Sequence, residues 1–356
     1  MNLQKDSLSI RHSPDNFLTG LLPEEIYRVC ALPQKFQGEQ IFRWIASGVE
    51  SFAEMTNLSL SERERLANSA VIRGSKLAVI LKDPDGTIKL GIDLYDSQRV
   101  ETVLLIDRAG RKTACVSCQV GCPMSCSFCQ TGQLGFTRNL TAAEIVEQFL
   151  HLEKIAGKLD NIVFMGMGEP MLNLPAIRKA IAVLTHKKGR ALSPRRITLS
   201  TSGICKGIYE LGSLGPDIRL AVSLTTANTA LRTKLMPITK QNSLEDLKKA
   251  IAFFNEKTKK RVTLELALMR GINTAPSFAR EVIEFSKGLN VHINLIPWNP
   301  VESLDYASPT EKELIGFESL LRKAGIPVTL RHRRGKTICG ACGQLGKKNN
   351  AKNSPS

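Results

Sequence analysis

The stretch Cys122-Pro123-Met124-Ser125-Cys126-Ser127-Phe128-Cys129 decides the fold class of this 356-residue chain. Its cysteines have the spacing C-x3-C-x2-C, which lets one short loop supply three thiolates to one face of an iron–sulfur cubane. Three ligands on a four-iron cluster leave one iron open, so such a cluster can bind a further molecule. A closed zinc site would need a fourth ligand at comparable distance. The spacing therefore predicts a [4Fe–4S] cluster held by Cys122, Cys126 and Cys129.

Strand and helix patterns alternate around and after this loop. Strand-like runs span 113–118, 161–165, 197–201, 218–224, 262–268 and 292–296, and helical patterns span 142–152, 174–184, 206–211, 244–254, 277–287 and 309–321. Six strand–helix units predict an α/β fold with a parallel sheet, because parallel neighbours need helical crossovers. They fit a partial (β/α)6 barrel better than a doubly wound sheet. In either arrangement ligand sites belong at the carboxyl ends of the strands.

The first 107 residues have a different pattern. Helix signals precede residue 75, with one helix starting at Pro23 and another capped by Ser59. A hairpin pattern follows at 77–81 and 88–94, and a third strand at 100–106. We therefore divide the chain into a helical, RNA-binding domain (1–75), a β-hairpin linker (76–107), the strand–helix core (108–338) and a C-terminal segment (339–356). The polar tail after Leu345 is expected to be disordered.

The charge of the chain points to a polyanionic partner. There are 49 Lys+Arg against 33 Asp+Glu, a net charge of +16, and such a field attracts nucleic acid. Aromatic residues are only 5% of the chain, which supplies few stacking platforms, so phosphate contacts should dominate RNA binding. The sequence contains neither a membrane-length apolar run nor a signal-peptide pattern, so we expect a cytoplasmic protein without membrane contact.

Nine cysteines, an odd number, argue against a secreted disulfide framework. Besides the triplet, Cys115-x2-Cys118 and Cys339-x2-Cys342 form two pairs. Their spacing alone is also that of a four-cysteine zinc site. The residues by themselves leave both readings open, either reactive thiols or zinc ligands.

The cluster motif within strand–helix units resembles the radical S-adenosylmethionine (SAM) superfamily. Further motifs are VETV at 100–103, CVSCQVGC at 115–122, GFTRNL at 135–140, MGMGEP at 165–170, TLSTSG at 198–203, INLIPWNP at 293–300 and ACGQL at 341–345. Together, and nearly end to end, they resemble the 23S rRNA (adenine-C2) methyltransferases of the RlmN type.

This resemblance implies radical chemistry on an adenine, whose C2–H is too unactivated for an ordinary methyl donor. In that family one SAM is cleaved reductively to a 5′-deoxyadenosyl radical. A second SAM first methylates a cysteine near the C-terminus, so each turnover uses two. The motif match makes Cys342 this methyl carrier, Cys115 the cysteine that resolves the product by forming a disulfide, and Glu101 the base that takes the C2 proton.

The resemblance also implies the SAM contacts, which are Gly168, Glu169, Ser200, Ser223, Leu224, Thr225 and Asn299. This chain departs from the family at Thr225, where His is common, at Cys118, where Ser is usual, and at Cys339. The implied partners are 23S rRNA, tRNA as a second substrate that the family often accepts, and a flavodoxin-type or similar reductant. We expect a monomer. The alternatives are an adenine-C8 methyltransferase of the same superfamily, a radical SAM enzyme acting on a small molecule, and a non-catalytic metal-binding RNA-binding protein.

Overall fold

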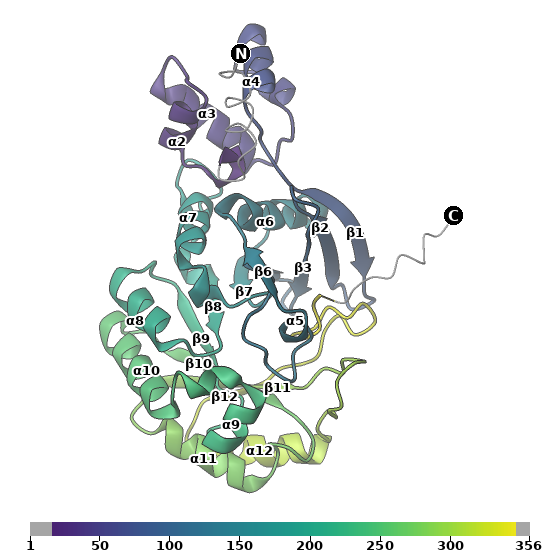
Figure 1. Cartoon of the computed structure of the whole chain (residues 1–356), viewed down its shortest axis with the longest axis vertical. Helices are drawn as coiled ribbons and strands as arrows, with labels where there is room; N and C mark the ends of the chain where they lie inside the picture. The colour runs from purple at the N-terminus through teal and green to yellow at the C-terminus, as the bar shows by residue number, and fades with distance from the viewer. Residues whose placement is uncertain (1–15, 347–356) are drawn as a thin grey trace.

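The computed structural model describes residues 16–346, and the predicted polar tail lies beyond them apart from its first residue. A ten-stranded sheet in the order β1-β2-β3-β4-β7-β8-β9-β10-β11-β12 organises the chain (Figure 1). Its parallel part consists of β4 (Lys112–Cys115), β7 (Asn161–Phe164), β8 (Ile197–Thr201), β9 (Arg219–Ser223), β10 (Val262–Leu268), β11 (Val291–Pro297) and β12 (Val328–Leu330).

Six helices follow these strands in the order that the sequence predicts, namely α6 (Ala142–Ala156), α7 (Leu174–Thr185), α8 (Cys205–Leu214), α10 (Leu244–Thr258), α11 (Pro276–Ser286) and α12 (Glu311–Lys323). A further helix, α9 (Thr229–Leu235), was not predicted. The predicted α/β fold with six strand–helix units is confirmed. The strand β12 was not predicted, because three residues are too few to display a periodic pattern.

The predicted hairpin is continuous with the core sheet. Strands β1 (Lys76–Lys82), β2 (Ile88–Asp93) and β3 (Arg99–Ile106) pair antiparallel, and β3 then pairs with β4. The turn between β1 and β2 also holds the C-terminal part of the chain: Asp85 Oδ2 accepts from the backbone N–H of Gly335 at 2.9 Å, and Asp83 Oδ2 accepts from that of Thr337 at 2.8 Å. This turn therefore helps to position the segment that precedes Cys342.

The N-terminal helices α2 (Pro23–Val29), α3 (Lys35–Ala46) and α4 (Leu60–Ser69) form a separate group at the top of Figure 1. Ser59 caps α4 as predicted, because its hydroxyl accepts from the N–H of Glu62 at 3.2 Å. The group is joined to α6 by the buried carboxylate of Glu147, which accepts from Thr19 Oγ1 at 2.6 Å and from the N–H of Ser75 at 2.9 Å. Burial raises the pKa of Glu147, so these donors offset the cost of placing its charge there.

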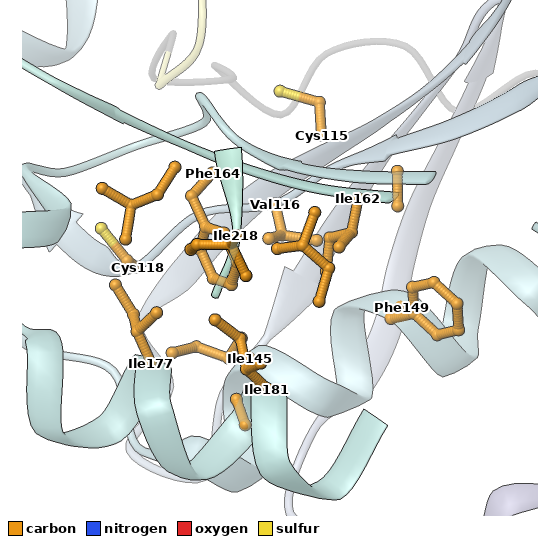
Figure 2. Close-up of a cluster of buried hydrophobic side chains, with 14 of the residues drawn as sticks. Cys115, Val116, Cys118, Ile145, Phe149, Ile162, Phe164, Ile177, Ile181 and Ile218 are labelled. Atoms are coloured by element: carbon orange, nitrogen blue, oxygen red, sulfur yellow. The ribbon is translucent and has the colours of Figure 1, made fainter. Parts of the chain in front are cut away.

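An apolar layer separates the sheet from the helices. Figure 2 shows Ile145, Ile177 and Ile181 from α6 and α7 facing Ile162 and Phe164 from β7. All five side chains are buried, and each fully buried side chain of this size contributes roughly 1.5–3 kcal/mol.

A small hairpin that the sequence did not predict frames the cluster loop. Strands β5 (Gln119–Gly121) and β6 (Phe136–Asn139) pair antiparallel on either side of it, and a short helix α5 (Gln130–Gln133) lies between them. The predicted strand at 113–118 ends at Cys115, so the loop follows β5. Gly121 has a φ of 76°, and a Cβ there would lie 2.0 Å from the carbonyl oxygen of Gly135. The start of the loop therefore requires glycine.

Candidate active site

A cavity at the carboxyl ends of the parallel strands brings most of the predicted residues together. We call it the cofactor cavity. The predicted site residues that line it are Cys122, Cys126, Cys129, Gly168, Glu169, Ser200, Ser223, Thr225, Asn299 and Cys342. The Leu224 side chain is buried elsewhere, and neither Cys115 nor Glu101 is part of the lining.

The cluster loop is held in shape by bonds to its backbone. Cys129 N–H donates to the carbonyl of Cys126 at 3.2 Å, and the Trp298 indole N–H donates to the carbonyl of Phe128 at 2.9 Å. Burial, with a smaller contribution from the neighbouring Cys129, raises the pKa of Cys122 to about 12. Thiols in such surroundings give up their protons to a bound metal centre, so the donor set fits an iron–sulfur cluster.

Gly168 and Glu169 follow β7 and pack closely against the residues around Gln119 and against the end of β8. Gly168 has a φ of 108°, and a Cβ there would lie 2.7 Å from the Gln119 side chain. The Glu169 carboxylate is buried and accepts from Thr201 Oγ1 and from the N–H of Ser202, both at 2.7 Å. Burial raises the pKa of Glu169. Its carboxylate thus ties β7 to the end of β8.

Glu265 is a cavity residue that the sequence analysis missed. It lies in β10, and its carboxylate accepts from Ser200 Oγ at 3.0 Å. Its carbonyl accepts from the N–H groups of Leu224 and Thr225, both at 3.0 Å. Thr225 has a φ of 61°, which is strained for a β-branched residue, and Asn273 Nδ2 donates to its carbonyl at 3.0 Å. A charged residue inside an otherwise apolar strand was the signal that could have found Glu265.

Arg232 is a second missed residue, and its side chain is completely buried. Its guanidinium donates to the carbonyls of Leu224 at 3.1 Å, Ser202 at 2.7 Å and Ser223 at 3.2 Å, and to Thr239 Oγ1 at 2.7 Å. All four acceptors are neutral. Burial lowers the pKa of Arg232 to about 10, so the group remains charged at neutral pH and fixes the ends of β8 and β9 relative to each other.

The segment that carries Cys342 is fastened over the cofactor cavity. Asn299 Nδ2 donates to the carbonyl of Cys342 at 3.0 Å, the N–H of Gln130 donates to the carbonyl of Gly343 at 2.8 Å, and Thr131 Oγ1 donates to that of Leu345 at 2.8 Å. Asn299 Oδ1 is buried and has no hydrogen-bond partner among residues 16–346. A buried acceptor left open in a cavity wall fits a ligand with a donor group such as SAM.

A second cavity brings Cys115 and Cys342 together. We call it the arginine cavity, because Arg108, Arg111, Arg196, Arg219, Arg331, Arg333 and Arg334 line it. Cys342 lines both cavities. The Cys115 side chain is buried, whereas that of Cys342 is exposed to the cavities. Desolvation raises the pKa of both thiols, the nearby Cys342 raises that of Cys115 further, and the Arg331 guanidinium acts against the increase in both. The two thiols therefore lie within each other's electrostatic reach, beside a cation that favours their thiolates.

Glu101 lies in β3, an interior strand, and is buried in an ion pair. Its Oε1 is 2.9 Å from Lys89 Nζ, and its Oε2 accepts from the N–H of Gly346 at 2.7 Å. Lys89 Nζ also lies 3.4 Å from the carbonyl of Cys339. Both ends of the segment 339–346, which contains Cys342, thus contact the Lys89–Glu101 pair.

The two C-x2-C pairs do not assemble into one zinc site. Figure 2 shows Cys118 on the helix side of the sheet near Ile177, and Cys115 on the opposite side. The zinc alternative is therefore disfavoured, because it requires four ligands about 2.3 Å from a single ion.

Comparisons with known proteins identify the family of the chain. Residues 116–276 match the radical SAM superfamily, and residues 32–72 match the N-terminal domain of ribosomal RNA large subunit methyltransferases. The crystal structure of a radical SAM methyltransferase from Sphaerobacter thermophilus is similar, with a TM-score of 0.89 and 38% identity over 92% of this chain and 98% of that chain. Fold and site together define a radical SAM enzyme, whose cofactors are a [4Fe–4S] cluster and SAM.

Sequence relatives narrow the assignment further. A probable dual-specificity RNA methyltransferase RlmN of Treponema pallidum is 62% identical over 330 residues, which cover 93% of this chain and 97% of the relative. Its counterpart in Treponema denticola is 64% identical over 329 residues, covering 92% and 95%. The chain belongs to the RlmN family.

Proposed function

We propose that the protein methylates C2 of an adenine in 23S rRNA, and of an adenine in tRNA as a second substrate, through a methyl group carried on Cys342. One observation carries the proposal. Cys342 lines both the cofactor cavity, where the three cluster cysteines lie, and the arginine cavity, where Cys115 lies. A carrier must exchange a group between a donor and an acceptor, and a residue shared by two chambers is suited to that task.

In this proposal Cys122, Cys126 and Cys129 hold the cluster. SAM binds in the cofactor cavity beside the cluster, where Asn299 offers an open hydrogen-bond acceptor and Ser200 offers a hydroxyl group. When bound, the cluster and SAM supply one-electron chemistry that removes a hydrogen atom from an unactivated carbon. The buried wall of the cavity excludes water from that reaction.

The two thiols then act in turn. The Cys342 sulfur attacks the methyl carbon of SAM, so an S–CH3 bond forms, and S-adenosylhomocysteine leaves with the electron pair of the broken bond. After the carbon has been transferred to the adenine, the Cys115 thiolate attacks the Cys342 sulfur. An S–S bond forms and the S–C bond to the RNA breaks, so the transferred carbon leaves with the electron pair of that bond and takes up a proton to become the methyl group on the adenine. Arg331 supports both steps, because it stabilises the attacking thiolates.

Glu101 is the proposed base for the C2 proton. Its contact with the N–H of Gly346 places the carboxylate beside the carrier segment, and the Lys89 ammonium offsets the cost of burying its charge. A carboxylate that is paired with an ammonium group and shielded from water can act as a proton acceptor.

We further propose a cytoplasmic monomer whose cluster receives electrons from a flavodoxin-type protein. Among residues 16–346 no helix has the length and apolarity to cross a membrane. Gel filtration with light scattering tests the monomer, and reduction of the reconstituted cluster by purified flavodoxin tests the electron donor. A stable dimer, or a cluster that flavodoxin does not reduce, contradicts the corresponding part.

Mass spectrometry of nuclease digests distinguishes the target atom. Unmodified 23S rRNA and tRNA are incubated anaerobically with reconstituted enzyme, SAM and reductant. We expect 2-methyladenosine in both digests. 8-Methyladenosine instead would replace the C2 assignment by the C8 alternative, and RNA binding without SAM consumption would identify a non-catalytic binding protein.

A further inference from the structure

The arginine cavity extends to the end of the sheet opposite the cluster loop. Asn161 and Arg219 begin β7 and β9, Arg196 directly precedes β8, and all three line the cavity. The remaining rim comes from the β3–β4 loop and from the segment after β12. The cavity therefore runs from the amino ends of the strands inward to Cys115 and Cys342, whereas ligands in this class of fold are expected at the carboxyl ends.

The cations of this cavity suit phosphate groups. Its lining, within residues 16–346, contains several arginines but no lysine, and Asp107 is its one carboxylate. Asp107 is paired with Arg111, which leaves the other guanidinium groups without an acidic partner in the described chain. The planar guanidinium binds phosphate oxygens in pairs, so a cluster of arginines is typical of nucleic-acid contacts.

The inner end of the cavity favours RNA over an acidic protein. An electron-donating protein gains from docking near the cluster, but Cys122, Cys126 and Cys129 line only the cofactor cavity. The arginine cavity leads instead to the carrier and resolving thiols, which are the groups that must meet the adenine.

We propose that the RNA enters through the arginine cavity, with its phosphates on the rim arginines and the target adenine extruded inward to Cys342. This inference rests on the proposed function and adds the path of the substrate. RNA and SAM then approach the carrier thiol from opposite ends of the sheet. A nucleobase has to leave its stack to reach a thiol in the wall of a cavity, and phosphate contacts on the rim hold the strand while it does so.

Neighbouring arginines provide a matched test. Arg196 lines the cavity and the adjacent Arg195 does not, and both are exposed. We would measure the affinity of the reconstituted holoenzyme for unmodified 23S rRNA between about 0.05 and 0.3 M salt, in the wild type, in Arg196→Gln/Arg219→Gln and in Arg195→Gln. If the double variant loses two phosphate contacts, the plot of log affinity against log salt concentration should become less steep by about 1.4–1.8. Its binding should also weaken at least about tenfold. Arg195→Gln should match the wild type.

Two further measurements separate this inference from the proposed function. Loading of a methyl group from SAM onto Cys342 without RNA should be equal in the double variant and the wild type; failure of the wild type to load would refute the proposed function itself. Unchanged salt slope and affinity in the double variant would overturn the RNA path. Slower cluster reduction by flavodoxin with intact RNA binding would also overturn it and identify the cavity as the donor's docking surface.

Discussion

Replacing Arg232 with methionine should loosen the wall of the cofactor cavity. The change removes four hydrogen bonds from a site that water does not reach. The carbonyl of Leu224 keeps a donor in the N–H of Thr226, at 2.7 Å. The Ser202 carbonyl and the Thr239 hydroxyl both lose the guanidinium as a donor, although the hydroxyl still donates to the Met236 carbonyl at 2.8 Å. Each buried acceptor left open costs about 1–3 kcal/mol. Relief from burying a cation returns part of this loss, so we expect a net decrease in unfolding free energy of about 2–4 kcal/mol.

The assay is urea unfolding of the cluster-free protein followed by circular dichroism, combined with SAM affinity of the reconstituted protein. Arg232→Lys keeps the charge, but an ammonium group cannot bridge the same carbonyls. The unfolding free energy of this variant should therefore lie between those of the wild type and Arg232→Met. Lys234→Met, an exposed change in the same helix, should stay within about 0.5 kcal/mol. If the unfolding free energy fell less in Arg232→Met than in Lys234→Met, and Arg232→Met bound SAM normally, the guanidinium would not be the group that holds the ends of β8 and β9 together.

Three more changes have defined outcomes. Lys89→Met should destabilise the fold by about 3–5 kcal/mol because it leaves the Glu101 carboxylate buried without its cation; recovery in the double variant Lys89→Met/Glu101→Gln checks this, and a neutral single variant contradicts it. Burial lowers the pKa of His151 from 6.5 to about 4, so the folded state binds fewer protons than the unfolded state and stability falls as pH drops through this range. Urea titrations should show a loss of about 2 kcal/mol in unfolding free energy between pH 7.5 and 5, and His151→Gln should lack this loss. Equal pH profiles in the two proteins would refute the role of His151. Cys118→Ser with Cys339→Ala should retain methyl loading of the carrier cysteine, whereas loss of bound zinc together with folding would revive the zinc alternative.

Local patterns predicted the core because its signals are local. The cysteine triplet lies within eight residues, and the strand–helix units each repeat over enough residues to be periodic. Short elements such as β12 and the β5–β6 hairpin lacked that length. Their formation depends on neighbours that the sheet supplies.

Long-range polar contacts could not be predicted. In the sequence Arg232 is indistinguishable from an ordinary helix residue, because its hydrogen-bond partners follow β8 and β9 and lie outside its own helix. Glu265 likewise bonds to Ser200, which is 65 positions away in the sequence. Glu101 could be taken for a solvated strand residue, but its partners Lys89 and Gly346 come from another strand and from the C-terminal segment. The arginine cavity likewise combines segments spread between Leu105 and Leu345, and no single one of them indicates a cavity.

The central claim is that Cys342 carries the methyl group between the two cavities. The most direct test is anaerobic reconstitution with iron and sulfide, addition of SAM, and intact mass of the peptide that contains Cys342. We predict a [4Fe–4S] cluster and a gain of one methyl group on this peptide, absent in Cys342→Ala. An unmodified Cys342 in protein that holds its cluster and binds SAM would contradict the account.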